Sequence, residues 1–145
     1  MAARIVRSVG LSLIANSVFA LSIVRVGPMV FRDNAVHVVT PEYPKSSIAA
    51  NVSGPAVAEV FVSDEGKVYN VKILEAPDLA IGNALKTALS KWVFRPFRVR
   101  QTMTGPSVPT PATSRLVFYF KSIDKKAIVI DAVEEELSSQ KQKRE

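Results

Sequence analysis

The centre of the chain alternates apolar and polar side chains with a period of two in two neighbouring segments. Residues 55–63 form the first segment and residues 67–75 the second. Such alternation is typical of strands with one buried face, because successive side chains point to opposite sides of the pleat. Ser63-Asp64-Glu65-Gly66 lies between them, where the glycine takes a positive φ without steric cost. The pattern predicts a hairpin whose buried face carries Ala56, Ala58, Val60 and Val62.

After Pro77 the period changes from two residues to three or four. Asp78 is suited to cap a helix, and Pro96 lacks the backbone donor that would continue one. We therefore expect a helix that starts at Leu79 and closes on residues 91–96. Its apolar face would consist of Ile81, Ala84, Leu85, Ala88, Leu89 and Trp92.

Residues 115–121 alternate again and predict the last strand of a sheet. Residues 101–114, just before it, are rich in Pro, Thr and Ser, and the segment is longer than most connections, which indicates a mobile loop. Because the strand follows the helix through this loop, we expect it at an edge of the sheet. Leu116, Phe118 and Phe120 would face one way, and Val117 and Tyr119 the other.

The N-terminal segment is typical of export. Arg4 and Arg7 precede an uncharged stretch, residues 8–24. We interpret residues 1–24 as a signal peptide cleaved after Ala20, or as a membrane anchor in which residues 8–24 tether the chain to the inner membrane. Both interpretations predict that the remainder lies in the periplasm.

Two flanking segments lie outside this central pattern. Residues 25–40 are interpreted as a connector, and the apolar pieces at residues 24–31 and 36–39 could add an edge strand. Residues 122–145 are interpreted as an extra strand followed by a charged tail. Within them, residues 127–130 form a compact run of mostly β-branched residues, and an amphipathic helix is expected from residue 131 onward. If residues 127–130 cover the sheet edge in the resting state, they would compete with an incoming strand.

Composition argues against several classes of function. The chain has no cysteine, which excludes a disulfide framework and a cysteine-based metal site. The formal net charge is +6, and removal of residues 1–20 with Arg4 and Arg7 leaves 17 basic against 13 acidic residues, or +4, a mild excess that a solvated basic surface explains. The single histidine, His37, has no partner motif, and the carboxylates are spread over turns and tail. We therefore expect no enzyme activity, no cofactor and no metal site.

A nucleic-acid binder is a further alternative, because basic and aromatic residues mix near the end of the expected helix. Trp92 and Phe94 follow core spacing, so we expect them to be buried rather than to stack on bases. Export would also separate the chain from nucleic acid, and no such partner is expected. The residues concerned are Lys91, Arg95, Arg98, Arg100 and Arg115, with Trp92, Phe94 and Phe97.

Three motifs occur in a fixed order between residues 41 and 121. They are Tyr43-Pro44 before a short helix, Asp64-Glu65-Gly66-Lys67-Val68 at the hairpin turn, and Trp92-Val93-Phe94-Arg95-Pro96 after the longer helix. In this order they resemble the C-terminal domain of TonB-like energy transducers. The resemblance implies an α+β fold, in which two short helices pack on a three-stranded antiparallel sheet.

The resemblance also implies a binding function. In this family the partner is an outer-membrane TonB-dependent receptor, a short segment of which is added as a strand to the sheet edge during energy-dependent transport. The Tyr-Pro segment lies beside the surface that receives this peptide, although Tyr43 could instead simply pack over the sheet edge. The expected partner-binding residues are Tyr43, Pro44, Arg115, Leu116, Val117, Phe118, Tyr119 and Phe120.

The chain departs from full-length transducers of this family in two respects. Those proteins carry a long Pro-rich spacer, and the His and Ser of their anchoring helix engage inner-membrane motor proteins. No Pro-rich run occurs here, and His37 lies outside the uncharged stretch. Inner-membrane motor proteins are therefore expected as partners only if the chain transduces energy without these two features. The alternative interpretation is an exported scaffold that keeps the fold without energy transduction.

Overall fold

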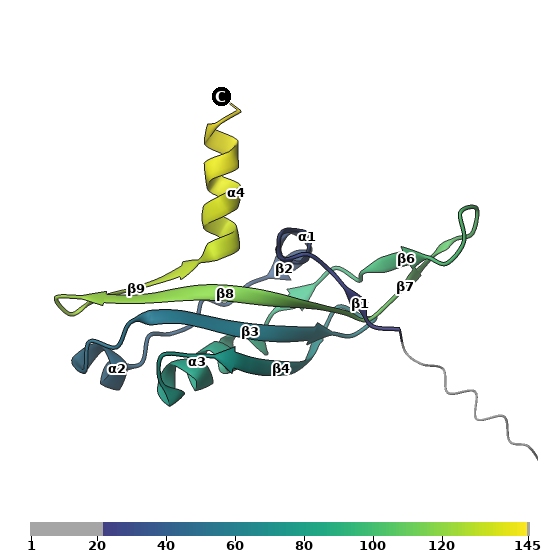
Figure 1. Ribbon diagram of the computed structural model, residues 1–145. Helices are drawn as coiled ribbons and strands as arrows, with labels where there is room; N and C mark the ends of the chain where they lie inside the picture. Colours follow the sequence, from purple (N-terminus) through teal and green to yellow (C-terminus); the bar gives the residue numbers. More distant parts are fainter. Residues whose placement is uncertain (1–21, 145) are drawn as a thin grey trace, which may run out of the picture.

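The computed structural model describes residues 22–144, and the centre of its fold is one mixed sheet (Figure 1). β3 (Gly54–Val62) pairs antiparallel with β4 (Val68–Glu75) on one side and with β8 (Ala112–Ile123) on the other. These strands form the predicted three-stranded antiparallel sheet, and the α+β class is confirmed. Two additional strands, the parallel β1 (Val24–Arg25) and the antiparallel β9 (Lys126–Asp131), both pair with β8 and extend the sheet to five strands.

Four helices accompany the sheet within the described residues. The two predicted helices are α2 (Lys45–Ala49) and α3 (Leu79–Leu89). The carboxylate of Asp78 caps α3 as predicted, because it accepts a hydrogen bond of 2.7 Å from the backbone N–H of Ile81. Two more helices, α1 (Pro28–Asp33) and α4 (Ala132–Gln142), lie outside the segment that resembles the family.

The end of α3 differs from the expectation. The helix stops at Leu89, and the segment that was expected to close it continues as β5 (Val93–Phe94), which pairs with β2 (Ala35–His37). Phe94 is fixed there because its N–H donates to the carbonyl of Gly66 over 2.8 Å. Gly66 has φ of 85°, and a Cβ at this position would lie 2.0 Å from the Phe94 carbonyl oxygen, so only glycine fits.

The segment expected to be a mobile loop, residues 101–114, is part of a second hairpin. β6 (Arg98–Arg100) pairs antiparallel with β7 (Ser107–Pro109), and β8 already begins at residue 112. Strands therefore replace residues 107–109 and 112–114 of the expected 101–114 loop, while residues 101–106 remain the turn of this hairpin. Figure 1 shows this hairpin projecting at the end of the sheet opposite to α2.

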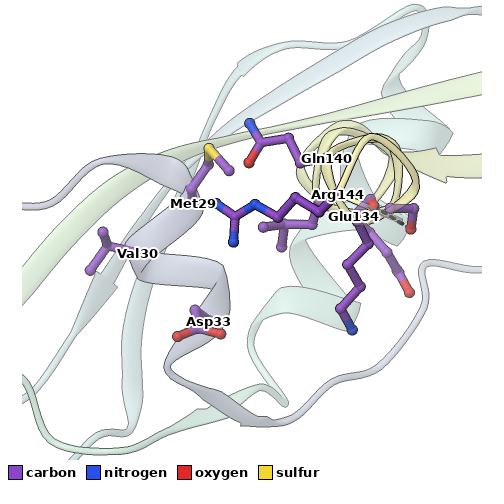
Figure 2. Close-up of a pocket in the computed structure, with 9 residues that line it drawn as sticks. Met29, Val30, Asp33, Glu134, Gln140 and Arg144 are labelled. Carbon is purple, nitrogen blue, oxygen red and sulfur yellow. Dashed lines mark hydrogen bonds between the residues drawn. The ribbon is translucent and has the colours of Figure 1, made fainter.

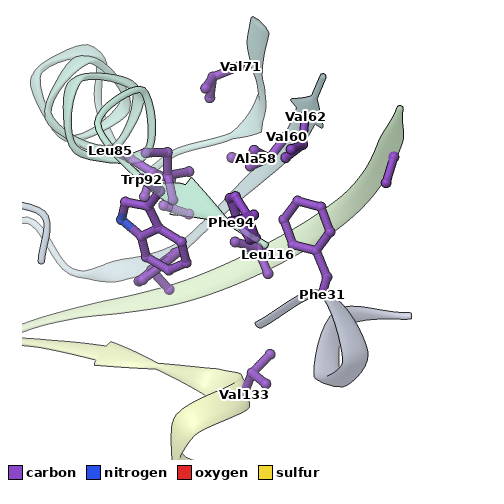
Figure 3. Packing of buried hydrophobic residues seen from close by; sticks show 14 of the residues in the cluster. Phe31, Ala58, Val60, Val62, Val71, Leu85, Trp92, Phe94, Leu116 and Val133 are labelled. Atoms are coloured by element: carbon purple, nitrogen blue, oxygen red, sulfur yellow. The ribbon is translucent and has the colours of Figure 1, made fainter. Parts of the chain in front are cut away.

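The core lies between α3 and the face of the sheet that carries the predicted apolar side chains (Figure 3). Trp92 is 1% exposed, and its indole N–H donates to the carbonyl of Val39 over 2.8 Å. Phe31 of α1 is fully buried and stacks on Phe97, so the expected connector contributes to the core. The predicted buried face of β3 and the predicted alternation of β8 are confirmed. Exposure is 0–2% at Ala56, Ala58, Val60, Val62, Leu116, Phe118 and Phe120.

The expected signal peptide or anchor, including the cleavage point after Ala20, lies outside the described residues apart from its last three positions. In residues 22–144, none of the helices has the length and apolar character needed to cross a bilayer. The nature of the N-terminal segment stays a prediction.

Replacing Trp92 should test how far the fold depends on this core. Trp92→Ala should lower the free energy of unfolding by about 3–5 kcal/mol, the usual range for deleting a buried aromatic side chain. Val93→Ala is the control, because Val93 is 39% exposed and should cost less than about 1 kcal/mol. Denaturant unfolding measures both, and equal losses in the two variants would contradict the burial of Trp92.

Candidate partner-binding edge

The main-chain groups of β8 point alternately toward β3 and away from it. Val24 N–H donates to the Pro111 carbonyl, and Val26 N–H donates to the Thr113 carbonyl, each over 2.9 Å. Because the direction repeats every second residue along a strand, the odd-numbered residues of β8 direct both N–H and C=O away from β3. We call this side the outer edge of β8. It is the edge on which the addition of a partner strand would depend.

The outer edge is occupied at both ends by strands of the chain itself. β1 pairs with Ala112 and Thr113, and β9 pairs with residues 118–123. The expectation that residues 115–121 form an edge strand is therefore wrong, because β8 lies inside the sheet over most of its length. The predicted pairing of residues 127–130 with an edge is confirmed, since they form the centre of β9.

A short gap remains between β1 and β9. Within the described part of the chain, no strand pairs with the outer side of residues 114–117. In this gap, Arg115 and Val117 direct their main-chain groups outward by the alternation described above. The side chain of Arg115 is exposed and that of Val117 is half-buried.

The other expected partner-binding residues are divided between the core and the surface. Leu116, Phe118 and Phe120 are buried in the core, whereas Tyr119 is 39% exposed on the opposite face. Tyr43 is 8% exposed, and its hydroxyl donates to the Val52 carbonyl. Its ring packs edge-on against the ring of Phe120, with 5.3 Å between the ring centroids. Tyr43 thus packs over the sheet, and a direct contact between its ring and a partner would require it to leave this position. Pro44 is the half-buried residue before α2.

A cationic side chain links α1, which follows β1, to the end of β9 and the start of α4. Arg32 Nε lies 2.8 Å from Asp131 Oδ2, and Arg32 Nη2 lies 3.4 Å from Glu134 Oε2. The guanidinium also sits 5.2 Å from the centre of the Trp92 ring. The side chains of Arg32 and Asp131 are only 16% and 9% exposed. Asp131 additionally accepts from Val133 N–H and so caps α4. We call this arrangement the Arg32 clamp.

Beyond the Arg32 clamp, α4 is loosely attached. An open groove of about 620 Å³ separates α1 from α4, with Met29 and Val30 on one side and Glu134, Gln140 and Arg144 on the other (Figure 2). Val133 is the one residue of α4 that is buried, and the helix points away from the sheet in Figure 1. The β9–α4 segment therefore depends for its position on the β8 ladder, on the Arg32 clamp, and on the packing of Val129, Val133 and Leu137 against the core.

Sequence reasoning did not find the Arg32 clamp. Arg32 and Asp131 are 99 positions apart, and neither belongs to a motif. The one available signal was the β-branched run at 127–130, which indicated pairing but not the clamp that follows it.

In residues 22–144, no group of three or more His, Cys, Asp or Glu side chains lies close enough to hold a metal ion.

Removing the Arg32 clamp should loosen β9. Hydrogen bonds to charged groups contribute about 1.5–3 kcal/mol, so Arg32→Gln should raise the exchange rate of β9 amide hydrogens about tenfold to a hundredfold. Arg25→Gln is the matched control. The Arg25 side chain is 69% exposed, and its Nη2 lies 3.8 Å from Glu59 Oε1, so it forms a surface ion pair of small energy. Hydrogen exchange followed by mass spectrometry gives both rates. Equal protection of β9 in the two variants would refute a role for Arg32 in holding it.

Comparison with known proteins identifies the family. The family model described as "Gram-negative bacterial TonB protein C-terminal" matches residues 39–111, half of the chain, and ends just before β8. The solution NMR structure of the Pseudomonas aeruginosa TonB C-terminal domain matches with a TM-score of 0.47 and 18% sequence identity, covering 63% of this chain and 87% of that one. A search of curated proteins gives no match. The chain therefore belongs to the family of Gram-negative bacterial TonB protein C-terminal domains.

Proposed function

We propose that this domain captures an extended segment of an outer-membrane TonB-dependent receptor by strand addition at the outer edge of β8. Domains of this family act in the periplasm, where they interact with such receptors and transduce energy for transport. The observation that carries the proposal is the gap at residues 114–117, where Arg115 and Val117 direct main-chain groups outward without a partner strand among residues 22–144. Unpaired strand groups are what an added strand requires.

Capture of a longer segment needs more of the edge than the gap offers. Each added residue pair gains main-chain hydrogen bonds, so affinity grows with the length of edge that is open. We propose that β9 and α4 leave when the receptor segment binds. Their departure is favoured by the weak attachment of α4, whose residues are mostly exposed. The β3 ladder on the other side of β8 stays intact.

In this proposal, β9 acts as an internal competitor for the receptor segment. The apparent affinity of an edge that is open for only a fraction of the time is reduced by that fraction. Minor states of proteins are commonly populated at about 0.1–10%. A closed edge also avoids pairing with other copies of the chain, which is the general hazard of an exposed strand.

A scaffold without energy transduction is the second candidate, and the closed outer edge favours it as well. If β9 never leaves, the domain has the family fold but offers an incoming strand only the short gap at residues 114–117. The absence of a Pro-rich run in the sequence is consistent with this role. The two candidates differ in whether receptor segments bind at β8.

The proposal also includes the location and the attachment of the chain. Residues 1–24 would direct export, with cleavage after Ala20 or with residues 8–24 retained as a tether in the inner membrane. Only a tethered chain can transmit force from inner-membrane motor proteins, so a motor partner requires that residues 8–24 are retained.

Proline at position 117 should separate main-chain capture from side-chain contact. Val117 directs its N–H to the outer edge, so Val117→Pro removes an outward donor and leaves the β3 ladder in place. We expect Val117→Pro to abolish binding of receptor N-terminal peptides, and Val117→Ala to weaken it only a few-fold. Isothermal titration with such peptides measures both, and circular dichroism checks the fold. If a folded Val117→Pro variant binds like the unchanged protein, this edge does not receive the segment.

Removing the internal competitor should strengthen capture. Deletion of residues 126–145 leaves the outer edge of β8 open, and peptide affinity should rise roughly tenfold to a hundredfold for an edge that was free about 1–10% of the time. Arg32→Gln serves as the milder variant and should raise affinity by a smaller factor while keeping the chain complete. If neither variant binds any receptor peptide although both remain folded, the scaffold function replaces the capture function.

A further inference from the structure

The solvent-facing side of the β8–β9 hairpin combines exposed isoleucines with lysines. The strand register pairs Lys121 with Ile128 and Ile123 with Lys126. These four side chains lie on the face opposite to the buried Phe120, because direction alternates along each strand. Ile123 is 65% exposed and Ile128 is 55% exposed. On this open face, Ile123 and Ile128 are therefore diagonal neighbours, and Lys121 and Lys126 flank them.

The end of this hairpin projects from the domain. The β3–β8 ladder ends where Gly54 pairs with Phe120, so the last residues of β8 run past the end of β3 (Figure 1). A two-residue turn closes the hairpin, with φ of 50° at Asp124 and 62° at Lys125. Positive φ at both positions matches the twist of a tight hairpin. The result is a convex tip, which we define as residues 121–128.

Positive charge dominates the tip. Lys121, Lys125 and Lys126 accompany one carboxylate, Asp124. Among the residues that the structure describes, no carboxylate lies within ion-pair distance of any of these three lysines. The lysines are therefore available to an external anion, and the isoleucines beside them are available to an apolar layer.

We propose that the tip docks on an anionic lipid surface. The exposed isoleucines would enter the boundary between headgroups and acyl chains, while the lysine stems extend so that their ammonium groups remain with the lipid phosphates. Tyr119 is 39% exposed on the same face. Its ring would lie at the level of the lipid headgroups, where tyrosine is enriched in membrane proteins. The main-chain groups that β8 and β9 direct toward each other are paired in the tip, so insertion leaves those groups with their partners.

A lipid surface fits this tip better than a rigid partner does. A convex projection with isolated apolar side chains needs a complementary cavity on a folded protein, whereas a lipid interface yields to its shape. The inference goes beyond receptor capture, because it uses the open face of the hairpin and not the outer edge of β8. Failure of either proposal leaves the other intact.

The full chain allows a local test, because it contains no natural cysteine. Ile123→Cys would carry an environment-sensitive fluorophore at the tip. Leu79→Cys is the matched control, since Leu79 is 80% exposed at the start of α3. Both labelled chains are mixed with vesicles of phosphatidylcholine alone or with 30% phosphatidylglycerol (about one anionic lipid in three). The N-terminal segment is the same in every variant, so differences between labels report the tip.

We expect a blue shift and at least a twofold rise in emission at position 123, only with phosphatidylglycerol, and no change at position 79. A lysine near an anionic surface contributes about fivefold in binding, so the combined change Lys121→Gln, Lys125→Gln and Lys126→Gln should reduce the response more than tenfold. Circular dichroism verifies its fold. An equal response in neutral vesicles, an unchanged response in the triple variant, or no response at position 123 would each overturn the proposal. A concentration-dependent response without vesicles would indicate contact with a second copy and would overturn it too.

Discussion

The two-sided hydrogen bonding of β8 is the constraint on which the rest of the structure depends. A strand inside a sheet must pair its main-chain groups on both sides, and a strand at an edge leaves one row open. β8 pairs with β3 along one side and with β1 and β9 at the two ends of the other, which leaves only residues 114–117 without an outer partner strand among residues 22–144. The chain on either side of the matched family segment is thus used to close the edge.

This closure explains why segments far apart in sequence meet beside β8. α1 follows β1 and places Phe31 in the core, while α4 follows β9 and buries Val133. Arg32 then bridges the two, because the carboxylates of Asp131 and Glu134 lie where β9 ends and α4 begins. Charge-assisted hydrogen bonds in a partly buried site are stronger than surface ion pairs, so the Arg32 clamp adds to the β8–β9 ladder and to Val133 in keeping the edge covered.

β8 and its partners present three surfaces with different physical character. The face with Leu116 and Phe118 is core and determines stability. The outer edge offers directional main-chain groups, which select for an extended chain of any sequence. The open face of the β8–β9 hairpin offers lysines and isoleucines, which suit an anionic interface rather than a peptide. Alternation assigns these surfaces to different groups of the same strand, and the departure of β9 that we propose for receptor capture would take the open face of the hairpin apart.

The sequence by itself determined the features that follow local rules: the buried faces of β3 and β8, the turn at Gly66 and the cap at Asp78. Side-chain alternation, positive φ and helix capping each depend on a few consecutive residues. Tertiary structure alone decided that α3 stops at Leu89, that β8 lies inside the sheet, and that Arg32 meets a carboxylate 99 positions away. These outcomes depend on which distant segment pairs with which, and no local pattern encodes that choice, because an apolar β-branched run such as that in β9 can pair with any open edge.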